Sequence, residues 1–508
     1  DLDEKQRAAT VLSDSQIVSL TKLGSQIESH YGCPQDIEWG VLDDTIYLLQ
    51  SRPITSLYPI EELKWKKDKD GDDGDDKLHI YISLGHQQNM TKAMPPLSLS
   101  TFRCVMPFRL KSDDHETSYV RASGGHLFKD MSYVLGHPVA RRIQMKIISK
   151  FDALAPEALD IARNRPEFQK AKQTISFFSI LECFPMIVYI FYRLQRALWW
   201  ERLTDCIADA NNTIGEEIKK LKEKLNKSPP NDHHAKLTAS IKSISTAFLT
   251  FRDGWCPLFV AGVMAHEIVR FIAQSWADDD TLEEARLGLA GNAVTEMNLI
   301  ICDLADLVRQ SPGLVALFEH ELGQDSEKFI NKVTTLAAKD DDDDNNVAAF
   351  LREWKLFLNN YGSRGASEID LMEPCWFEEP LPILQVIASH LTKEKGSHRV
   401  QHEKLNQTRE KAVAKIMDGA KGGLFGWLRV RILKRLLYVV EHTSLREHHK
   451  FFIIQMFGEI KKVVKETGAS LSDRNIVSHP DDIWFLTWPE LLKLCQPITT
   501  ISAEVKKA

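Results

Sequence analysis

The sequence lacks the paired cysteines that mark zinc sites and disulfide frameworks. Its eight cysteines are scattered through 508 residues, and no two of them stand in a CxxC spacing. Small zinc sites and disulfide-rich secreted domains both need such pairs. We therefore expect reduced, mostly buried thiols in a cytoplasmic protein. The GxxxxGK phosphate loop and the HExxH zinc motif are also missing, so the sequence gives no sign of a P-loop nucleotide site or a metalloprotease.

Long hydrophobic runs and excess positive charge are scarce as well. A net charge of −7 argues against a general binder of nucleic acid or anionic membranes. The most apolar run, residues 174–192, is interrupted by Glu182 and Pro185, so a buried helix is expected there rather than a membrane span. The hydrophobic share of 43% is typical of a globular protein. We expect neither nucleic acid nor a membrane among its partners.

A stretch near the start of the chain contains two runs of alternating residues. The runs, residues 36–42 and 46–52, flank a polar Asp43-Asp44-Thr45, and this pattern predicts a β-hairpin. With a three-residue loop, the pairs that share a face are Leu42 with Ile46, Gly40 with Leu48, Glu38 with Gln50, and Asp36 with Arg52. A two-residue loop would scatter the polar residues over both faces, because a one-residue slip inverts every side chain of one strand.

The three-residue loop puts an acid, an amide and a cation in a row on one face. Glu38 and Gln50 offer oxygen ligands for Mg²⁺, and the Arg52 fork can hold a phosphate. That face therefore suits a nucleotide, although an ordinary solvated face with a cross-strand charge pair fits the same pattern. The opposite face is expected to be apolar and consists of Ile37, Trp39, Val41, Tyr47 and Leu49.

Acidic runs interrupt the chain at residues 64–77 and 340–346. In the first run, Asp73 stands at the sixth position of a possible calcium loop where glycine is needed, and His79 stands at the twelfth where glutamate is needed. We interpret the first run as a solvated linker and the second as a loop between helices.

Most of the remaining sequence has helical periodicity. Ser13 and Gln16 have capping-box spacing at the start of a helix before the hairpin. Apolar residues recur at helical intervals from Met297 to Val308, and Pro312 follows. The predicted fold is α+β: a helix and hairpin followed by a predominantly helical region over residues 79–495, with an aromatic and aliphatic pocket.

QDIEW followed by LQSRPIT resembles the end of the ATP-grasp nucleotide-binding domain of phosphoenolpyruvate synthase, pyruvate phosphate dikinase and the rifampin phosphotransferases. The order of segments after the hairpin is more similar to the rifampin phosphotransferases. It includes the GHQQ of residues 85–88 and the segments 292–309, 361–376 and 445–492. No alternation typical of a barrel is present for a pyruvate module.

The resemblance implies a dikinase-type reaction. In this family, ATP phosphorylates a histidine on a swivelling domain, and the phosphohistidine passes its phosphoryl group to a substrate, leaving AMP and phosphate. By motif position, Glu38 and Gln50 would be metal and nucleotide ligands, and Arg52 a phosphate contact. The implied cofactors are ATP and Mg²⁺.

The resemblance also offers substrate-site candidates, namely His86, Glu368 and Asp370. The acidic pair has an alternative interpretation as a polar loop. The substrate is expected to be a bulky hydroxylated compound or a pyruvate-like acid, and the sequence does not say which.

The predicted domain limits follow from these segments. Residues 1–57 are the C-terminal piece of an ATP-grasp domain, 58–78 a linker, 79–495 the substrate-binding domain, and 496–508 the start of a linker to a histidine domain. We expect the 508 residues alone to be inactive as a piece of a longer phosphotransferase, with the missing histidine domain as their partner. The alternative is a divergent, non-catalytic binding or structural protein.

Overall fold

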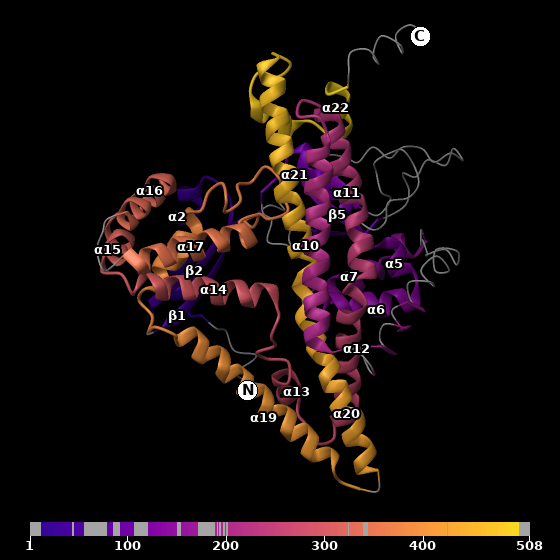
Figure 1. Cartoon of the computed structure of the whole chain (residues 1–508). Helices are drawn as coiled ribbons and strands as arrows, with labels where there is room; N and C mark the ends of the chain where they lie inside the picture. Colours follow the sequence, from indigo (N-terminus) through magenta and orange to yellow (C-terminus); the bar gives the residue numbers. More distant parts are fainter. Residues whose placement is uncertain are drawn as a thin grey trace. The chain divides into compact units, whose positions relative to one another are not determined.

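The computed structural model describes residues 12–42, 45–54, 79–84, 92–105, 120–149, 154–170, 188–189, 191–192, 195–196, 199, 202–323, 325–338, 344–423 and 425–496. Within these residues the chain is mainly helical and has two small antiparallel sheets (Figure 1). The expected predominance of helix in an α+β chain is confirmed. The chain forms two compact units, residues 1–94 with 116–174 and residues 95–115 with 175–508.

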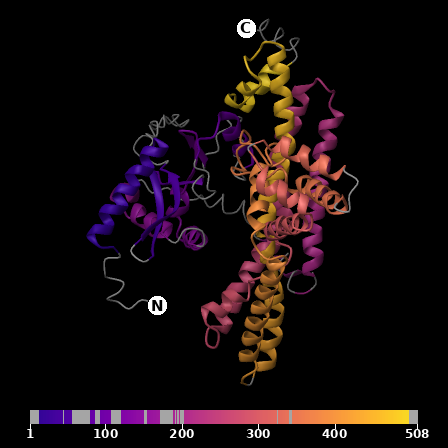
Figure 2. The ribbon, with the colours of Figure 1, turned by 90° about the vertical axis from the view of Figure 1, so that its left-hand side faces the viewer.

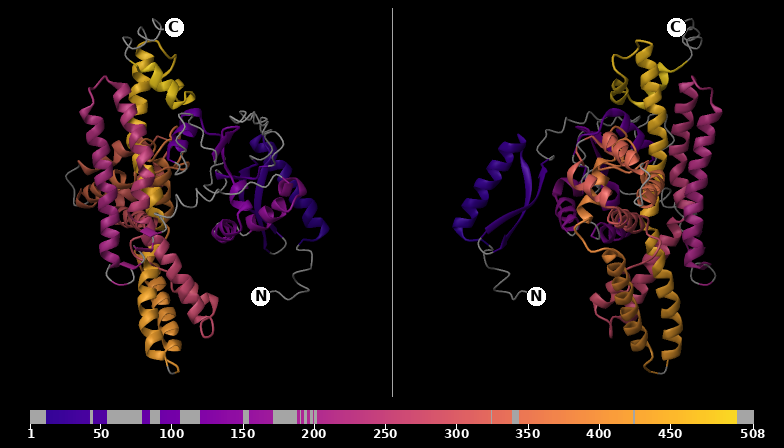
Figure 3. Two further views of the ribbon diagram at one scale, coloured as in Figure 1. Left: turned by 90° about the vertical axis from the view of Figure 1, so that its right-hand side faces the viewer. Right: turned by 60° about the vertical axis from the view of Figure 1, so that its left-hand side comes forward.

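The first unit begins with a helix and a hairpin. Helix α2 (Asp14–Tyr31) starts at the predicted capping box, in which the Ser13 hydroxyl and the Gln16 side chain each accept a backbone N–H from the other residue, and it ends at Gly32 with φ 69°. Strands β1 (Gln35–Leu42) and β2 (Thr45–Pro53) follow as an antiparallel pair, and α2 contacts both (Figure 3).

A second small sheet in this unit has the order β3-β5-β4. Its strands are β3 (Tyr81–Ser83), β5 (His126–Asp130) and β4 (Val120–Ser123). Helices α5 (Ser132–Gly136), α6 (Pro138–Ile148), α7 (Ala155–Arg163) and α8 (Pro166–Lys170) follow. They enclose a small core with Met131 and Phe168 at its centre.

The second unit is built on long helices that run side by side (Figures 1 and 2). They are α10 (Leu203–Lys227), α11 (His233–Asp253), α12 (Cys256–Ala273), α19 (Ser397–Ala420), α20 (Gly426–Val440) and α21 (His448–Asp473). The shorter helices η3 (Glu441–Glu447), η4 (Pro480–Phe485), α22 (Trp488–Leu494) and α13 (Asp279–Glu284) complete this bundle. Their apolar faces share one large core.

A second core of this unit is rich in aromatic side chains. It is formed by α14 (Ala293–Val308), α15 (Pro312–His320), α16 (Ser326–Ala337), α17 (Asp344–Tyr361) and α18 (Leu381–His390). Helix α14 matches the predicted periodic segment. The acidic run at 340–346 was predicted as a loop, but its last three residues begin α17, so that prediction is wrong for them.

Helix α4 (Pro96–Val105) packs into the large core although it lies far from its neighbours in sequence. Leu97 is fully buried, and the indole Nε1 of Trp488 donates a hydrogen bond of 2.6 Å to the Thr101 hydroxyl, 387 positions away. The second unit is therefore closed by contacts between its two ends.

One apolar stretch in the described residues, His233–Ala273 over α11 and α12, has the length and composition needed to cross a membrane. Leu237, Trp255 and Ala261 from this stretch are buried in the large core. A core helix pair of a folded bundle meets the same criteria. The apolar run noted in the sequence, residues 174–192, lies almost wholly outside the described residues.

The predicted domain limits stay a prediction, since residues 55–78 and 497–508 lie outside the described part of the chain. Residues 79–94 and 116–174 belong to the same compact unit as the helix and hairpin.

Candidate functional site

The hairpin register agrees with the prediction at its open end and differs near the loop. Glu38 pairs with Gln50 and Asp36 with Arg52, as expected. Leu42, however, pairs with Thr45 in place of Ile46, so two residues connect the strands instead of three. The register shifts between Glu38 and Trp39, which leaves Leu49 as the extra residue of a bulge.

The bulge changes the faces of the hairpin. Because paired residues share a face, Leu48 joins Trp39, and Tyr47 joins Gly40 on the same side as Glu38. The expectation that Tyr47 lies opposite Glu38 is therefore wrong, whereas Trp39 lies opposite as predicted.

Arg52 connects the three polar residues of the predicted nucleotide site. A single guanidinium nitrogen, Nη2, donates to Glu38 Oε1 at 2.5 Å and to Gln50 Oε1 at 2.6 Å. The Arg52 and Glu38 side chains are 38% and 56% exposed. The cluster is open to solvent. It lies on the half of the hairpin where the observed register agrees with the predicted one.

The donor set of this cluster fits a hard divalent cation. A carboxylate and an amide oxygen converge on one point, now taken by the positive charge of Arg52. Mg²⁺ prefers such oxygen ligands together with phosphate oxygens and water. Glu38 and Gln50 could thus hold Mg²⁺ while Arg52 turns to a phosphate, and the cation would neutralise the phosphate charge.

Glu368 lies in a loop between α17 and α18, residues 362–380, that we call the acidic loop. Its carboxylate accepts a hydrogen bond of 2.6 Å from the Nε–H of Arg364, and it lies 3.0 Å from the Lys450 ammonium of α21. Only 9% of the Glu368 side chain is exposed, and Arg364 is equally buried. The Arg364 pair therefore braces the acidic loop internally, and the Lys450 pair ties the loop to α21.

Asp370, the second candidate in the acidic loop, is also buried. The Ser98 hydroxyl donates to its Oδ1 at 2.6 Å, and the Met372 N–H donates to the same oxygen at 2.9 Å. Burial raises the pKa of Asp370, and these two hydrogen bonds offset the rise only in part. Asp370 thus anchors helix α4 to the acidic loop. A substrate role for Glu368 and Asp370 remains a prediction, and His86 lies outside the described residues.

The sequence analysis missed a third acidic group of this loop, Glu378. Its carboxylate pairs with the buried ammonium of Lys461 and with Lys465 at 2.6 Å, and the Cys375 thiol donates to it at 3.0 Å. Burial alone would raise the pKa of Glu378, but these partners outweigh it and hold the pKa at about 2. Burial and the bond to Glu378 raise the pKa of Cys375 to about 12.

One sequence signal could have revealed this network. Lys461 interrupts an apolar stripe of α21 formed by Phe457, Ile460 and Val464. A lysine in such a stripe is rarely buried without a partner. The position of the partner could not be read from the sequence, because Glu378 is far away along the chain.

A hollow of about 680 Å³ opens beside η3 and the start of α14. Thr295 and Arg446, from two of the segments that carry the family resemblance, line it together with His402. Ser444 also lines it. That residue is 2% exposed, and its hydroxyl has no hydrogen-bond partner. The walls are mainly polar, whereas an aromatic and aliphatic pocket was expected.

A group of possible metal ligands lies on α14, where Asp303 and Asp306 approach His398 within 4.8 Å. Both carboxylates are already engaged, Asp303 by Arg399 and His398 and Asp306 by Arg309 and the Gly396 N–H. The two arginines supply the positive charge that a metal would bring. The group is therefore an ion-pair network that joins α14 to α19.

Comparisons with known proteins match the regions that contain the hairpin cluster and the hollow at η3. The rifampicin phosphotransferase fourth domain matches residues 255–447, and the AMP/ATP-binding domain of pyruvate phosphate dikinase matches residues 1–72. The hairpin cluster lies inside the second match, and all the residues that line the hollow at η3 lie inside the first.

Curated relatives cover nearly the whole chain. A rifampicin phosphotransferase of Bacillus cereus is 28% identical over 96% of the chain and 52% of the relative, and one of Bacillus subtilis is 26% identical with the same coverage. A probable phosphoenolpyruvate synthase of Methanothermobacter thermautotrophicus is 53% identical over 10% of the chain and 8% of the relative.

The chain spans about half the length of the rifampicin phosphotransferases that it matches. The matches at both ends of the chain point to the same group of proteins. Over most of its length the chain is therefore similar to the rifampicin phosphotransferase and phosphoenolpyruvate synthase family.

Proposed function

We propose that this chain is part of an ATP-dependent dikinase-type phosphotransferase. It would supply the last piece of the ATP-grasp domain and the helical domain that binds the phosphoryl acceptor. ATP would phosphorylate a histidine of a swivelling domain, and that phosphohistidine would pass its phosphoryl group to the acceptor, leaving AMP and phosphate. The similarity to the rifampicin phosphotransferases and the match to an AMP/ATP-binding domain support the use of ATP.

The observation that carries this proposal is the convergence of Glu38, Gln50 and Arg52 on one exposed face. Phosphoryl transfer depends on positioned positive charge around the phosphates. Arg52 would hold a phosphate oxygen through its planar fork. Glu38 and Gln50 would keep Mg²⁺ beside that phosphate, and the metal would stabilise the charge that develops during transfer.

The acceptor would bind in the hollow at η3. Its polar walls fit a bulky hydroxylated compound, because hydroxyl groups can both donate to its carboxylates and accept from its arginines. The unpaired Ser444 hydroxyl would meet one of these groups. A pyruvate-like acid is the smaller alternative and would need only one of the arginines.

The test measures AMP formation from ATP by the full-length protein. Glu38→Ala should abolish most turnover, since it removes the charged metal ligand, and Arg52→Lys should weaken it because a point charge replaces a planar fork. Asp43→Ala, in the connection between the strands, is the matched control and should leave turnover unchanged. Full turnover in the Glu38 variant would contradict the assignment of the site.

The second candidate function is a non-catalytic binding protein derived from the same family. It is favoured by the burial of every acidic group in the acidic loop that was considered for chemistry. It predicts that the full-length protein makes no AMP even with its hairpin intact.

A further inference from the structure

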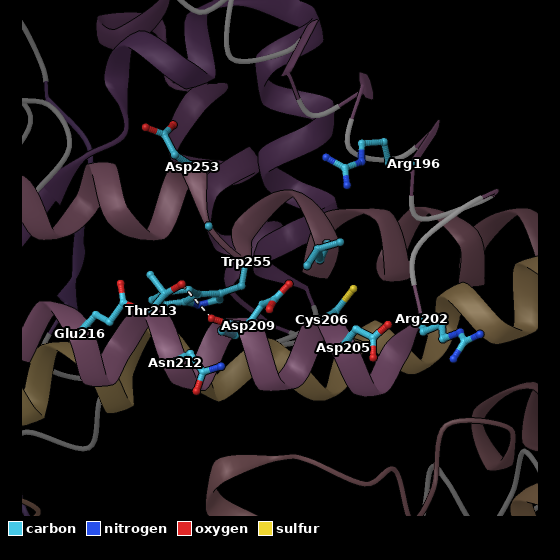
Figure 4. Close-up of a pocket in the computed structure, with 13 residues that line it drawn as sticks. Arg196, Arg202, Asp205, Cys206, Asp209, Asn212, Thr213, Glu216, Asp253 and Trp255 are labelled. Atoms are coloured by element: carbon cyan, nitrogen blue, oxygen red, sulfur yellow. Dashed lines mark hydrogen bonds between the residues drawn. The ribbon is translucent and has the colours of Figure 1, made fainter.

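A second hollow, lined by none of the residues assigned above, lies between α10 and the corner where α11 meets α12 (Figure 4). Its volume is about 660 Å³, which is within the range of sites for small organic ligands. Side chains of α10 form one wall, and the opposite wall comes from Asp253, Gly254 and Trp255.

The wall formed by α10 carries unpaired negative charge. Asp205, Asp209 and Glu216 are spaced four and seven residues apart, so they share one face of the helix. All three are exposed, and none forms an ion pair with another residue of the described part of the chain. Asp253 on the opposite wall differs, because Arg252 holds both of its oxygens at 2.6 and 2.9 Å.

The two ends of the hollow differ in charge. Arg196 and Arg202 line the end near Asp205, whereas Glu216 and Thr213 lie at the other end (Figure 4). The end near Asp209 and Glu216 is thus the negative end. An ammonium group would be attracted there by the carboxylates of Asp209 and Glu216, because the nearby Lys220 is paired with Glu217 at 2.7 Å.

Trp255 adds an independent sign of a ligand. It is 1% exposed, and its indole Nε1 has no hydrogen-bond partner although it borders the hollow. The ring is held edge-on by Phe251 at 5.9 Å and by Phe452 at 5.8 Å, so it cannot turn freely toward another acceptor. Buried N–H donors in folded proteins almost always have an acceptor. A ligand oxygen in the hollow would provide one.

We propose that this hollow binds a hydroxylated organic amine. Its ammonium groups would lie beside Asp209 and Glu216, which are two helical turns apart, and a hydroxyl oxygen would accept the Trp255 N–H. The site is separate from the nucleotide and acceptor sites proposed above, so its test does not depend on phosphotransferase activity.

Isothermal titration calorimetry with three probes at low salt tests the proposal. Kanamycin offers both amines and hydroxyls, spermidine offers amines alone, and maltotriose offers hydroxyls alone. Kanamycin should bind most tightly, spermidine more weakly because it leaves the indole unsatisfied, and maltotriose not measurably.

Variants locate the binding. The double variant Asp209→Asn with Glu216→Gln should lower kanamycin affinity at least about tenfold. Glu223→Gln, an exposed carboxylate two turns further along α10, should leave it unchanged. Trp255→Phe should weaken kanamycin but not spermidine. The double variant changes only exposed side chains, so it keeps the test decisive if Trp255→Phe fails to fold.

Three results would overturn the proposal. They are absence of kanamycin binding, equal weakening by Glu223→Gln and the double variant, and spermidine binding as tight as that of kanamycin. The second result would show nonspecific attraction to an acidic protein.

Discussion

Glu38 on the hairpin and Glu368 in the acidic loop are each paired with an arginine, yet their surroundings are opposite. The Glu38 side chain is 56% exposed, and one guanidinium is its partner. The Glu368 side chain is 9% exposed and is held by Arg364 and Lys450 together. An exposed pair can exchange its partner for a ligand at little cost, whereas a buried one cannot lose a partner without leaving an uncompensated charge.

The comparison separates groups that are available for binding from groups committed to structure. Glu378 and Asp370 belong with Glu368 among the structural groups, because protein donors already occupy their oxygens. Measurements of stability test this division, beginning with the variant that should lose the most stability and ending with the one that should lose the least.

Lys461→Met should lower the free energy of unfolding by about 3–5 kcal/mol. The lysine side chain is 4% exposed, and its loss leaves the buried Glu378 carboxylate short of positive charge. Lys465→Met is the matched control, because Lys465 pairs with the same carboxylate but is 51% exposed, and it should cost less than about 1 kcal/mol. Urea titrations that give equal losses would refute the division by burial.

Glu368→Gln should lower the free energy of unfolding by about 2–3 kcal/mol, because Arg364 stays buried without a counter-charge. Asp370→Asn should be neutral or slightly stabilising. Burial raises the pKa of Asp370, so its ionised form disfavours folding above the pKa of the unfolded chain, and asparagine removes that charge while keeping the acceptor oxygen. A large loss in the Asp370 variant would contradict this sign.

The pH dependence of stability should report His448, which begins α21. Burial lowers its pKa to about 4, and the neighbouring His449 adds to the shift. The unfolded chain then takes up a proton that the folded chain refuses, so stability is full above about pH 6.5 and falls toward pH 4. Between about pH 7 and pH 5, denaturant titrations should show a loss of roughly 2 kcal/mol that His448→Gln lacks. His479→Gln, at an exposed site, should keep it.

Glu38→Gln on the hairpin should change the free energy of unfolding by less than about 0.5 kcal/mol, because exposed ion pairs contribute little. The same variant should impair use of ATP in the full-length protein. A stability loss as large as that of Glu368→Gln would show that the hairpin cluster is structural after all.

The hairpin shows how far sequence reasoning reaches. The separation of twelve residues between Glu38 and Gln50 is satisfied by a three-residue loop, but equally by a two-residue connection with one bulged residue. Counting residues cannot tell where the extra one lies, so the polar pair was predicted correctly and Tyr47 was not. The bulge at Leu49 follows from packing and twist that the alternation does not encode.

Helix positions were predicted well because their signals are local. The capping box at Ser13 and the periodicity of α14 both act within a few residues. The ion pairs of the acidic loop were missed because each joins residues that are distant in sequence, such as Glu378 and Lys461. Which acid meets which base depends on how the helices pack, and composition does not reveal that.

The contact between Thr101 and Trp488 has a consequence for synthesis on the ribosome. Helix α4 leaves the ribosome 387 residues before its partner in α22. At about 5–20 residues per second, this interval lasts roughly 20–80 seconds. Within this interval α11 can already cover part of α4, but η4 and α22 cannot. A truncation before η4 should therefore leave the Thr101 side of α4 without its partner Trp488, and we expect it to lower the solubility of the protein.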